Sequence, residues 1–482
     1  MTDISRSPLT RASHVAVACL LAALSGCAVL PEPTPSQVQS EALGHVDIPD
    51  AWASSAASAE VIDGWLASFN DPALTQLVQE ALANNPDLQI AAARLEQSNA
   101  QLEIAQAQLK PGIGVLGRAG TKPVSDLVPL FSGAMLRLSW EIDLWGRLRY
   151  GRNAAMAARD ASSADYQFAQ QSLAAGVARA WFVACETGQQ KALADRMVTS
   201  AQALLELAEQ RRRIGAGDES DVIAARASLS DYENARQQVE LAHLQSRRAL
   251  ELLLGRYPGA NLASGTGLPT FPGPVPSGIP MDVLNRRLDV QAAERRVAAA
   301  FDRVGEAKAS MLPSLSLSAG YGRLSNEVLE TRSGLEQTLS SVTGTTTVPV
   351  YAGGALSGQV TLRTAEQKQA VADYSRKALA ALGEVEDALS AERILGERES
   401  TLKATRAATQ EALQLEQSAY RVGKSDLRAV NQRQLALHAA DVALIALQSD
   451  RLTRRVDLYL ALGGSFDTAT GVITSASAAG AE

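Results

Sequence analysis

The sequence predicts a mainly α-helical protein with a transmembrane β part, built by duplication of one large unit. Asp87-Leu88-Gln89 returns as Asp289-Val290-Gln291 at an offset of 202 residues (289 − 87), and Leu254-Gly255 returns as Leu462-Gly463 at an offset of 208 (463 − 255). A period this long indicates one supersecondary unit used twice rather than a solenoid of small repeats. Each copy is interpreted as a helix, two strands, a very long helix, a tight turn and a returning helix.

Residues 1–26 are predicted to be a lipoprotein signal peptide. Arg6 and Arg11 precede an apolar stretch, Val15 to Leu24, that is too short to span a membrane. The stretch ends in Leu24-Ser25-Gly26-Cys27, which resembles the lipobox of bacterial lipoproteins; the alternative is an ordinary signal peptide that happens to precede a cysteine. The resemblance implies that Cys27 carries the acyl chains, and Ala28 after it favours the outer membrane.

Composition limits which disulfides can form and which kinds of partner the chain can bind. The chain has three cysteines; Cys19 leaves with the signal, Cys27 is taken by lipid, and Cys185 remains as a buried apolar residue without a disulfide partner. The formal net charge of −7, without a dense basic face, argues against nucleic acid as a partner. Residues 27–60, rich in proline at their start, are predicted to be a lipidated, extended N-terminal tether.

Two very long helices are expected, one in each copy. Residues 147–213 and 356–421 are proline-free and rich in Ala, Leu, Gln, Glu and Arg, so each predicts a helix of about 100 Å. Neither contains eighteen consecutive apolar residues, which favours coiled-coil walls exposed to water over membrane spans. Several shorter helices of a globular bundle are the alternative, disfavoured by the equal lengths in the two copies.

Shorter helices flank each long one. Residues 72–109 and 218–254 are expected to be half-length helices in the first copy, as are 281–311 and 426–462 in the second. Asp71-Pro72 provides a cap followed by proline at the first helical position, and Pro111 and Pro313 end the corresponding helices. The predicted organisation is a first repeat at 61–255, a Gly/Pro-rich equatorial connection at 256–280, a second repeat at 281–463 and a C-terminal tail at 464–482.

Two strands are predicted between the first two helices of each copy. Leu136, Leu138, Trp140 and Ile142 alternate with polar residues after a weaker strand at Ile113 and Val115, and 315–321 and 341–350 provide the second pair. Such alternation is typical of a transmembrane barrel, although a soluble half-buried sheet would show it too. Four strands cannot close a barrel, and an open edge cannot lie in lipid. Strands in a membrane would therefore require an oligomer.

The segment Trp140-Glu141-Ile142-Asp143-Leu144-Trp145-Gly146-Arg147 carries a recognisable motif. It resembles the W-x-x-D-L-F/W-G-R segment of the TolC-like outer membrane factors, specifically the NodT-type lipoprotein branch that serves resistance-nodulation-division efflux systems. Further matching pieces cover residues 60–465; they are Asn85-Pro86-Asp87-Leu88, Leu109-Lys110-Pro111, Pro313-Ser314-Leu315, Val348 to Gly354, and Tyr420-Arg421-Val422-Gly423.

This resemblance implies a homotrimer that spans the outer membrane. Three sets of four strands would make a twelve-stranded β-barrel, continuous with an α-barrel tunnel across the periplasm, and residues 52–70, 255–280 and the tail would form a belt around the tunnel. The partners would be a periplasmic membrane-fusion adaptor, an inner-membrane resistance-nodulation-division pump and outer-membrane lipid. The junction between barrel and tunnel would lie at Trp140, Asp143, Trp145, Gly146, Gly353 and Gly354.

The resemblance also assigns a role to the two tight turns. They would be the periplasmic tips that meet the adaptor and close the channel, with Gly215, Gly217, Gly423, Lys424 and Ser425 as contacts, and with Asp218 or Ser425 capping the returning helices. Many members have an Asp nine residues beyond the tip glycine, where this chain has Ala224 and Gln432. The candidate constriction residues are therefore nearby polar side chains: Asp221, Asp426, Arg428, Gln432 and Arg433.

No catalytic arrangement, cofactor motif or metal site is expected. Gly423-Lys424-Ser425 resembles the end of a phosphate-binding loop but lacks the first glycine, and His243 and His438 each stand alone. The predicted function is a passive efflux duct for drugs or other toxic small molecules. The alternatives are the outer membrane duct of a type I protein secretion system and a lipid-anchored periplasmic coiled-coil binding protein without a pore.

Overall fold

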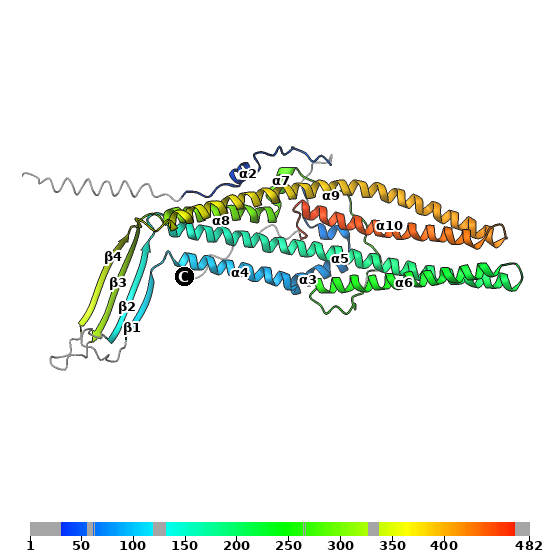
Figure 1. Ribbon diagram of the computed structural model, residues 1–482, viewed down its shortest axis with the longest axis horizontal. Coiled ribbons are helices and arrows are strands. Elements are labelled where there is room, and N and C mark those ends of the chain that lie inside the picture. The colour runs from blue at the N-terminus through cyan, green and yellow to red at the C-terminus, as the bar shows by residue number, and fades with distance from the viewer. Residues whose placement is uncertain are drawn as a thin grey trace, which may run out of the picture. The chain divides into compact units, whose positions relative to one another are not determined.

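The computed structural model describes residues 30–54, 61, 63–118, 132–263, 265, 267–325 and 337–467 (Figure 1). The predicted signal peptide, the lipobox cysteine Cys27 and tail residues 468–482 lie outside the described residues. The chain divides into two compact units, and each unit draws on both repeats. Unit 1 comprises Met1–Val46, Arg94–Ser163 and Ala292–Arg376; unit 2 comprises Asp47–Ala93, Ala164–Gln291 and Lys377–Glu482.

None of the helices in the described part of the chain has the length and apolar character needed to cross a membrane.

Unit 1 contains one antiparallel sheet of four strands. The strands are β1 (Gly112–Arg118), β2 (Ser132–Ile142), β3 (Ser314–Ser325) and β4 (Gln337–Thr347), in the order β1-β2-β3-β4. The four predicted strands are confirmed, but the expected end of the last strand at residue 350 is wrong. Pro349 lacks an N–H and restricts Val348 before it, so pairing ends at Thr347.

The register of the sheet separates an apolar face from a face of mostly small or polar residues. Leu138 pairs with Ile113 on one side and Ala319 on the other, and Ala319 pairs with Val342. Because side chains alternate between faces, residues two positions apart in each strand join the same row. The apolar face carries Ile113, Val115, Leu136, Leu138, Trp140, Ile142, Leu315, Leu317, Tyr321 and Val342.

Both long helices form, α5 (Arg147–Arg213) with the predicted bounds and α9 (Ala355–Arg421) one residue earlier at its start than predicted. Each has 67 residues. Unit 1 contains the start of each and the ends of α4 (Pro86–Ala107) and α8 (Leu288–Ala309). The absence of proline and the supply of strong helix-forming residues explain why neither long helix breaks.

The N-terminal tether is not extended throughout, contrary to expectation. α2 (Pro35–Leu43) begins with a capping box in which the Thr34 side chain accepts from Gln37 N while the Gln37 side chain accepts from Thr34 N. The helix buries Val38, Ala42 and Leu43. Pro35 favours this start because proline fits the first helical position. The proline-rich composition was therefore a misleading guide.

Unit 2 is a helical body with an aromatic core. It contains η1 (Trp65–Phe69), α3 (Pro72–Asn84), α6 (Glu219–Leu253), α7 (Pro280–Arg286) and α10 (Leu427–Ala461), with the remaining parts of α4, α5, α8 and α9. The Asp71 side chain accepts from Ala73 N and Leu74 N, which confirms the predicted helix start. In the core Trp65 stacks on Tyr459 at a centroid distance of 5.8 Å, and Phe69 lies 5.2 Å from Phe182.

The expected single helices at 72–109 and 281–311 are wrong, because each is broken at an equivalent position. Asn85 and Arg287 both have extended backbone, with ψ of 125° and 120°. Pro86 disfavours a helical Asn85, whereas Arg287 breaks its helix without a proline. Asn85 Nδ2 donates to Leu253 O at 2.9 Å and Arg287 Nη1 to Ala461 O at 3.4 Å. At each break a side chain thus donates a hydrogen bond to a carbonyl group at the end of the returning helix in its own repeat.

The equatorial connection has little regular structure and is held by side chains of the helices. Glu251 accepts hydrogen bonds from three successive backbone N–H groups, those of Ala260, Asn261 and Leu262. Phe271 lies under two guanidinium groups, with Arg451 Cζ at 3.8 Å and Arg455 Cζ at 4.4 Å from the ring centroid. The connection therefore belongs to the packed body of unit 2.

Candidate functional site

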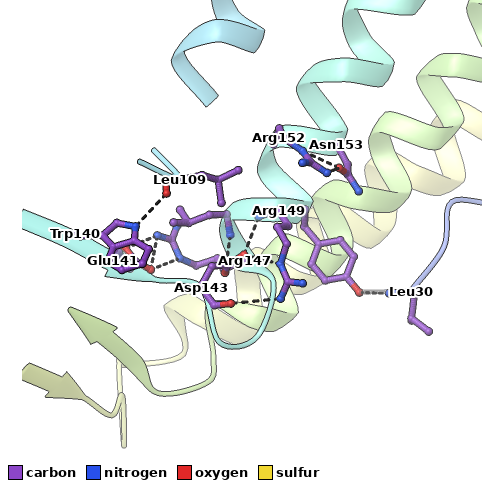
Figure 2. Close-up of polar contacts among 11 residues, drawn as sticks. Leu30, Leu109, Trp140, Glu141, Asp143, Arg147, Arg149, Arg152 and Asn153 are labelled. Atoms are coloured by element: carbon purple, nitrogen blue, oxygen red, sulfur yellow. Dashed lines mark hydrogen bonds and ion pairs between the residues drawn. The ribbon is translucent and has the colours of Figure 1, made fainter. Parts of the chain in front are cut away.

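The strand-to-helix junction in unit 1 is organised by Asp143, which caps the N-terminus of α5. Its Oδ1 accepts from Leu148 N at 3.1 Å and its Oδ2 from Arg149 N at 3.0 Å (Figure 2). The Arg149 side chain returns to the same carboxylate, with Nε at 3.1 Å from Oδ2. Gly146 takes a φ of 78°, which a side chain would disfavour, and so lets the chain turn from β2 into α5. These contacts explain the Asp and Gly of the motif.

The two tryptophans of the motif bind the two helix-to-strand crossings. Trp140 Nε1 donates to Leu109 O at 3.0 Å, between α4 and β1, and Trp145 Nε1 donates to Pro313 O at 2.7 Å, between α8 and β3. Leu109 precedes Pro111 by two residues, and Pro111 corresponds to Pro313 in the second repeat. The two tryptophans of one motif thus hold the equivalent helix-to-strand connections of both repeats in place.

Two further contacts tighten the junction. Arg147 Nη2 lies 2.8 Å from each carboxylate oxygen of Glu141, so the first residue of α5 pairs with the end of β2. The Tyr150 hydroxyl accepts from Leu30 N at 2.8 Å, which attaches the start of the described N-terminal segment to α5 (Figure 2). The Glu141–Arg147 ion pair and the tyrosine contact are features that the sequence did not predict.

At the second junction two glycines form the turn from β4 into α9. Gly353 and Gly354 have φ of 61° and 85°, and Gly354 corresponds to Gly146 at the offset of 208. The Gly354 carbonyl accepts from Gly358 N at 2.9 Å and from the Ser357 hydroxyl at 2.9 Å. The structure therefore places five of the six predicted junction residues in strand-to-helix turns of unit 1, and the sixth, Trp140, near the end of β2.

The predicted tip turns in unit 2 have the same backbone hydrogen bonds. Ala216 N donates to Arg211 O at 2.9 Å and Gly215 N to Arg212 O at 3.1 Å, while Lys424 N and Gly423 N repeat the pattern at 2.9 and 3.1 Å. This is the Schellman arrangement, which requires a left-handed residue, and Gly215 and Gly423 have φ of 70° and 75°. The tight reversals are thus confirmed.

The predicted caps at the tips need correction. Asp218 stands at the N-cap of α6, but its side chain makes no capping hydrogen bond. Ser425 is not a cap either, because its hydroxyl donates to the Glu416 carboxylate. Asp426 caps α10, accepting from Ala429 N at 2.8 Å. Gly217 is not left-handed; a Cβ there would lie 2.9 Å from Arg211 Cβ, so space and not backbone conformation requires the glycine.

A link between the two hairpins lies directly behind the tips. Arg211 Nη1 donates to Tyr420 O at 2.7 Å, Arg211 Nη2 donates to Ala216 O at 3.2 Å, and the guanidinium carbon lies 4.5 Å from the Tyr420 ring centroid. The ring is 2% exposed and packs in one apolar cluster with Val222, Leu427 and Val430. In the sequence, the run Arg211-Arg212-Arg213 indicates a basic last turn that complements the helix dipole or docks to an acidic adaptor surface, and it does not indicate this link.

The candidate constriction residues divide into two groups. Arg428, Gln432 and Arg433 are exposed within the single chain, whereas Asp426 is engaged as a cap and Asp221 is half-buried. All five lie in the first turns of α6 and α10, and Asn431 Nδ2 donates to Ser228 Oγ at 3.2 Å between those helices. The structure brings the two predicted tips together, while the role of these side chains as a gate stays a prediction.

The isolated histidines and cysteine have packing partners. His243 Nδ1 lies 3.1 Å from the Thr187 hydroxyl, and burial, with the charges of Arg247 and Lys191, lowers the pKa of this imidazole. Burial raises the pKa of the Cys185 thiol to about 12, which leaves it protonated. Within the described ranges no group of three His, Cys, Asp or Glu side chains could hold a metal ion.

Comparison with known proteins decides the family. The model of the family described as outer membrane efflux protein matches residues 77–256 and 279–464, which are the two repeats without the equatorial connection. The chain belongs to the outer membrane efflux protein family. The matched ranges include the tryptophan junction and both glycine tips, so the predicted resemblance to the outer membrane factors of the TolC and NodT type is confirmed.

Relatives in this family have different cargoes. The toluene efflux pump outer membrane protein TtgF of Pseudomonas putida is 30% identical over 94% of this chain and 97% of its own length. The pyoverdine export outer membrane protein OpmQ of Pseudomonas putida is 30% identical over 87% of this chain and 92% of its own. Among solved structures, the outer-membrane channel OprN matches with a TM-score of 0.78 and 26% identity, covering 87% of this chain and 97% of its own.

Proposed function

We propose that three copies of this chain form the outer-membrane duct of a tripartite efflux pump and export small toxic molecules passively. The observation that carries the proposal is the sheet of unit 1, whose apolar face is uncovered in the described chain. Val115 and Val342 are 75% and 78% exposed there, and Tyr321 is 64% exposed. An apolar face of this extent needs a cover. In an outer membrane efflux protein, membrane lipid is the cover that its strand alternation fits.

The edges of this sheet support the homotrimer. β1 and β4 are the outer strands, so each has one side without a strand partner among the described residues. Unpaired N–H and C=O groups in hydrocarbon cost several kcal/mol each. Pairing β1 of one copy with β4 of the next removes both edges, and three copies provide twelve strands, which is within the range of membrane barrels.

The helices would provide the periplasmic part of the duct. By family resemblance, α5 and α9 with their shorter partners form the α-barrel tunnel, the equatorial connection contributes to a belt, and the glycine tips meet a periplasmic membrane-fusion adaptor coupled to an inner-membrane resistance-nodulation-division pump. Cys27 would carry the lipid anchor. The supporting observation is that both tips have the same turn geometry, and a repeated surface suits a partner that contacts each hairpin in turn.

The cargo is proposed only as a class. Relatives named for toluene and for pyoverdine share the fold and about the same identity with this chain. Since relatives named for two such different compounds resemble this chain equally, the fold alone does not fix the cargo, and the pump would choose the substrate. Small molecules are favoured over secreted proteins because these two relatives are named for small molecules.

A pair of adjacent lysine substitutions tests the proposed membrane position. Val342 lies on the apolar face of β4 and Thr343 on the polar face, and both are exposed in the single chain. A lysine on the lipid face of a barrel costs about 2–4 kcal/mol near the midplane. We expect V342K to reduce the yield of heat-modifiable, detergent-resistant trimers and T343K to preserve it.

The duct itself is tested by single-channel conductance in planar bilayers; a monodisperse monomer without conductance would overturn the proposal.

A further inference from the structure

The polar face of the sheet carries an arginine without a counter-charge. Arg137 lies in β2 and is exposed, and no ion pair or hydrogen bond of its side chain is found in the described part of the chain. Among strand residues whose side chains the structure describes, Arg137 and Glu141 are the charged ones, and Glu141 is neutralised by Arg147 at 2.8 Å. Arg137 therefore contributes a net positive charge to this face.

The strand register places small, uncharged residues on both sides of Arg137. Arg137 pairs with Gly114 of β1 on one side and with Gly320 of β3 on the other, and Gly320 pairs with Ser341 of β4. Its row therefore presents no larger side chain than serine. Of the two adjacent rows on the same face, one contains Ser139, Ser318 and Thr343 and the other contains Leu116, Met135 and Leu339, and none of these residues carries a charge. No carboxylate in the described strands lies nearer to Arg137 than Glu141, four residues along β2.

We propose that Arg137 is a charge-selecting residue of the exit section, where three copies form a cationic ring that favours small anionic solutes over cations. This inference rests on the proposed function, because it needs the polar face of the sheet to line a water-filled interior. Charges on lumen-facing strands tune the selectivity of membrane barrels. The cargo class that benefits is small organic anions, while polyvalent cations are repelled.

A reporter cysteine beside Arg137 tests the inference. Ser139 is exposed on the same strand and the same face, two residues from Arg137, which is about 7 Å along a strand. A unit charge at that distance in water changes the local concentration of a monovalent ion by roughly threefold. S139C is labelled on intact cells with an anionic and with a cationic methanethiosulfonate reagent of similar size. Cys185 is 0% exposed, so the chain without S139C provides the background.

The expected result is that the anionic reagent reacts several-fold faster relative to the cationic one in S139C than in S139C/R137Q, and that S139C/R137E reverses the preference. The difference should shrink in 1 M salt, where the Debye length is about 3 Å. S139C/R376Q is the matched control, because Arg376 lies on α9 outside the sheet and its loss should leave the ratio unchanged.

Two failures are distinguishable. If S139C resists both reagents although the protein is in the outer membrane, the water-filled interior is absent and the proposed duct is overturned together with this inference. If both reagents react but R137Q leaves their ratio unchanged, the duct stands and the role of Arg137 is overturned. In planar bilayers R137Q should also move the reversal potential in a salt gradient toward cation preference.

Discussion

Trp145 donates its indole Nε1–H to the carbonyl oxygen of Pro313 at 2.7 Å, across 168 residues of sequence. Trp140, five residues earlier, makes the same kind of bond to Leu109 at 3.0 Å. Pro313 and the region of Leu109 are equivalent places in the two repeats, where a helix passes into a strand. The motif Trp-x-x-x-x-Trp therefore couples the two halves of the duplication at the sheet, which explains why both aromatic residues carry an N–H.

We expect W145F to lower the temperature at which the proposed detergent-resistant trimer dissociates. Phenylalanine keeps most of the ring packing but removes the donor, and one buried hydrogen bond contributes about 1 kcal/mol. W140F should have a smaller effect, because Trp140 is 38% exposed. Y351F is the control at the same junction, since Tyr351 is 88% exposed. Equal dissociation temperatures for W145F and the wild-type protein would contradict the structural role of the indole.

Four glycines with left-handed backbone allow the cost of backbone strain to be distinguished from the cost of a steric clash when each is replaced by alanine. Gly255 has a φ of 71°, and a Cβ there would lie 2.6 Å from Asn84 O; at Gly463, with a φ of 70°, it would lie 3.1 Å from Arg286. Gly215 and Gly423 have similar φ but nothing within 4 Å. Alanine in this conformation costs about 1–2 kcal/mol. We expect G255A to destabilise the protein most, G463A next, and G215A and G423A by the strain alone, in chemical denaturation followed by circular dichroism.

The sequence predicted the elements whose cause is local. Both 67-residue helices lie within one residue of the expected bounds because no proline interrupts them, and four strands form where apolar and polar residues alternate. The helix break at Arg287 could not be predicted, since it depends on a carbonyl 174 residues away. The break at Asn85 was visible in Pro86, and α2 was visible in the capping box of Thr34 and Gln37. In those two cases the local signal was present but was outweighed by composition.

The candidate site shows the same division between local and distant causes. Glycine at the tips follows from the turn geometry, so Gly215 and Gly423 could be predicted from the sequence. The partner of Arg211 could not, because the duplication aligns Tyr420 with Arg212 (420 − 208) but does not say which residues of the two tips come into contact. Pairings across the duplication require the helices to be packed before they can be recognised.

A buried carboxyl in α8 predicts a pH dependence of stability. Asp302 is 0% exposed, and burial with the nearby negative charge of Glu32 raises the pKa of this carboxyl to about 7, although Arg152 and Arg303 act in the opposite direction. Between its ordinary value of 3.8 and about 7, the folded state holds a proton that the unfolded state has lost. Stability should therefore fall as pH rises through this window, by up to about 1.4 kcal/mol per pH unit.

D302N removes this titration, so its trimer should dissociate at a temperature that changes less between pH 4 and pH 8 than that of the wild-type protein. The variant should be the more stable of the two at pH 8, where the wild-type carboxyl is ionised within the fold. D373N is the control, because Asp373 lies on the surface of α9, beside Arg376, with 52% of its side chain exposed. Parallel pH profiles for D302N and the wild-type protein would contradict the assignment.

The contact between Arg211 and Tyr420 predicts how the proposed resting gate is held closed. R211A removes the hydrogen bond to the Tyr420 carbonyl and the cation–π contact at 4.5 Å. Such contacts contribute roughly 2 kcal/mol together when partly buried, and each 1.4 kcal/mol is a tenfold change in an equilibrium. If this link stabilises the closed tip, R211A should raise single-channel conductance or open time several-fold.

Tyrosine variants separate the ring from its hydroxyl. The Tyr420 hydroxyl is buried without a hydrogen-bond partner in the described chain, whereas the ring and the backbone carbonyl receive Arg211. Y420F should therefore conduct like the wild-type channel, and Y420A, which loses the ring but keeps the carbonyl acceptor, should raise conductance less than R211A. R213A is the charge control, because Arg213 is exposed in the same helix turn. A similar rise in conductance in R213A would assign the effect to the charge of the tip, and the specific link between the hairpins would be wrong.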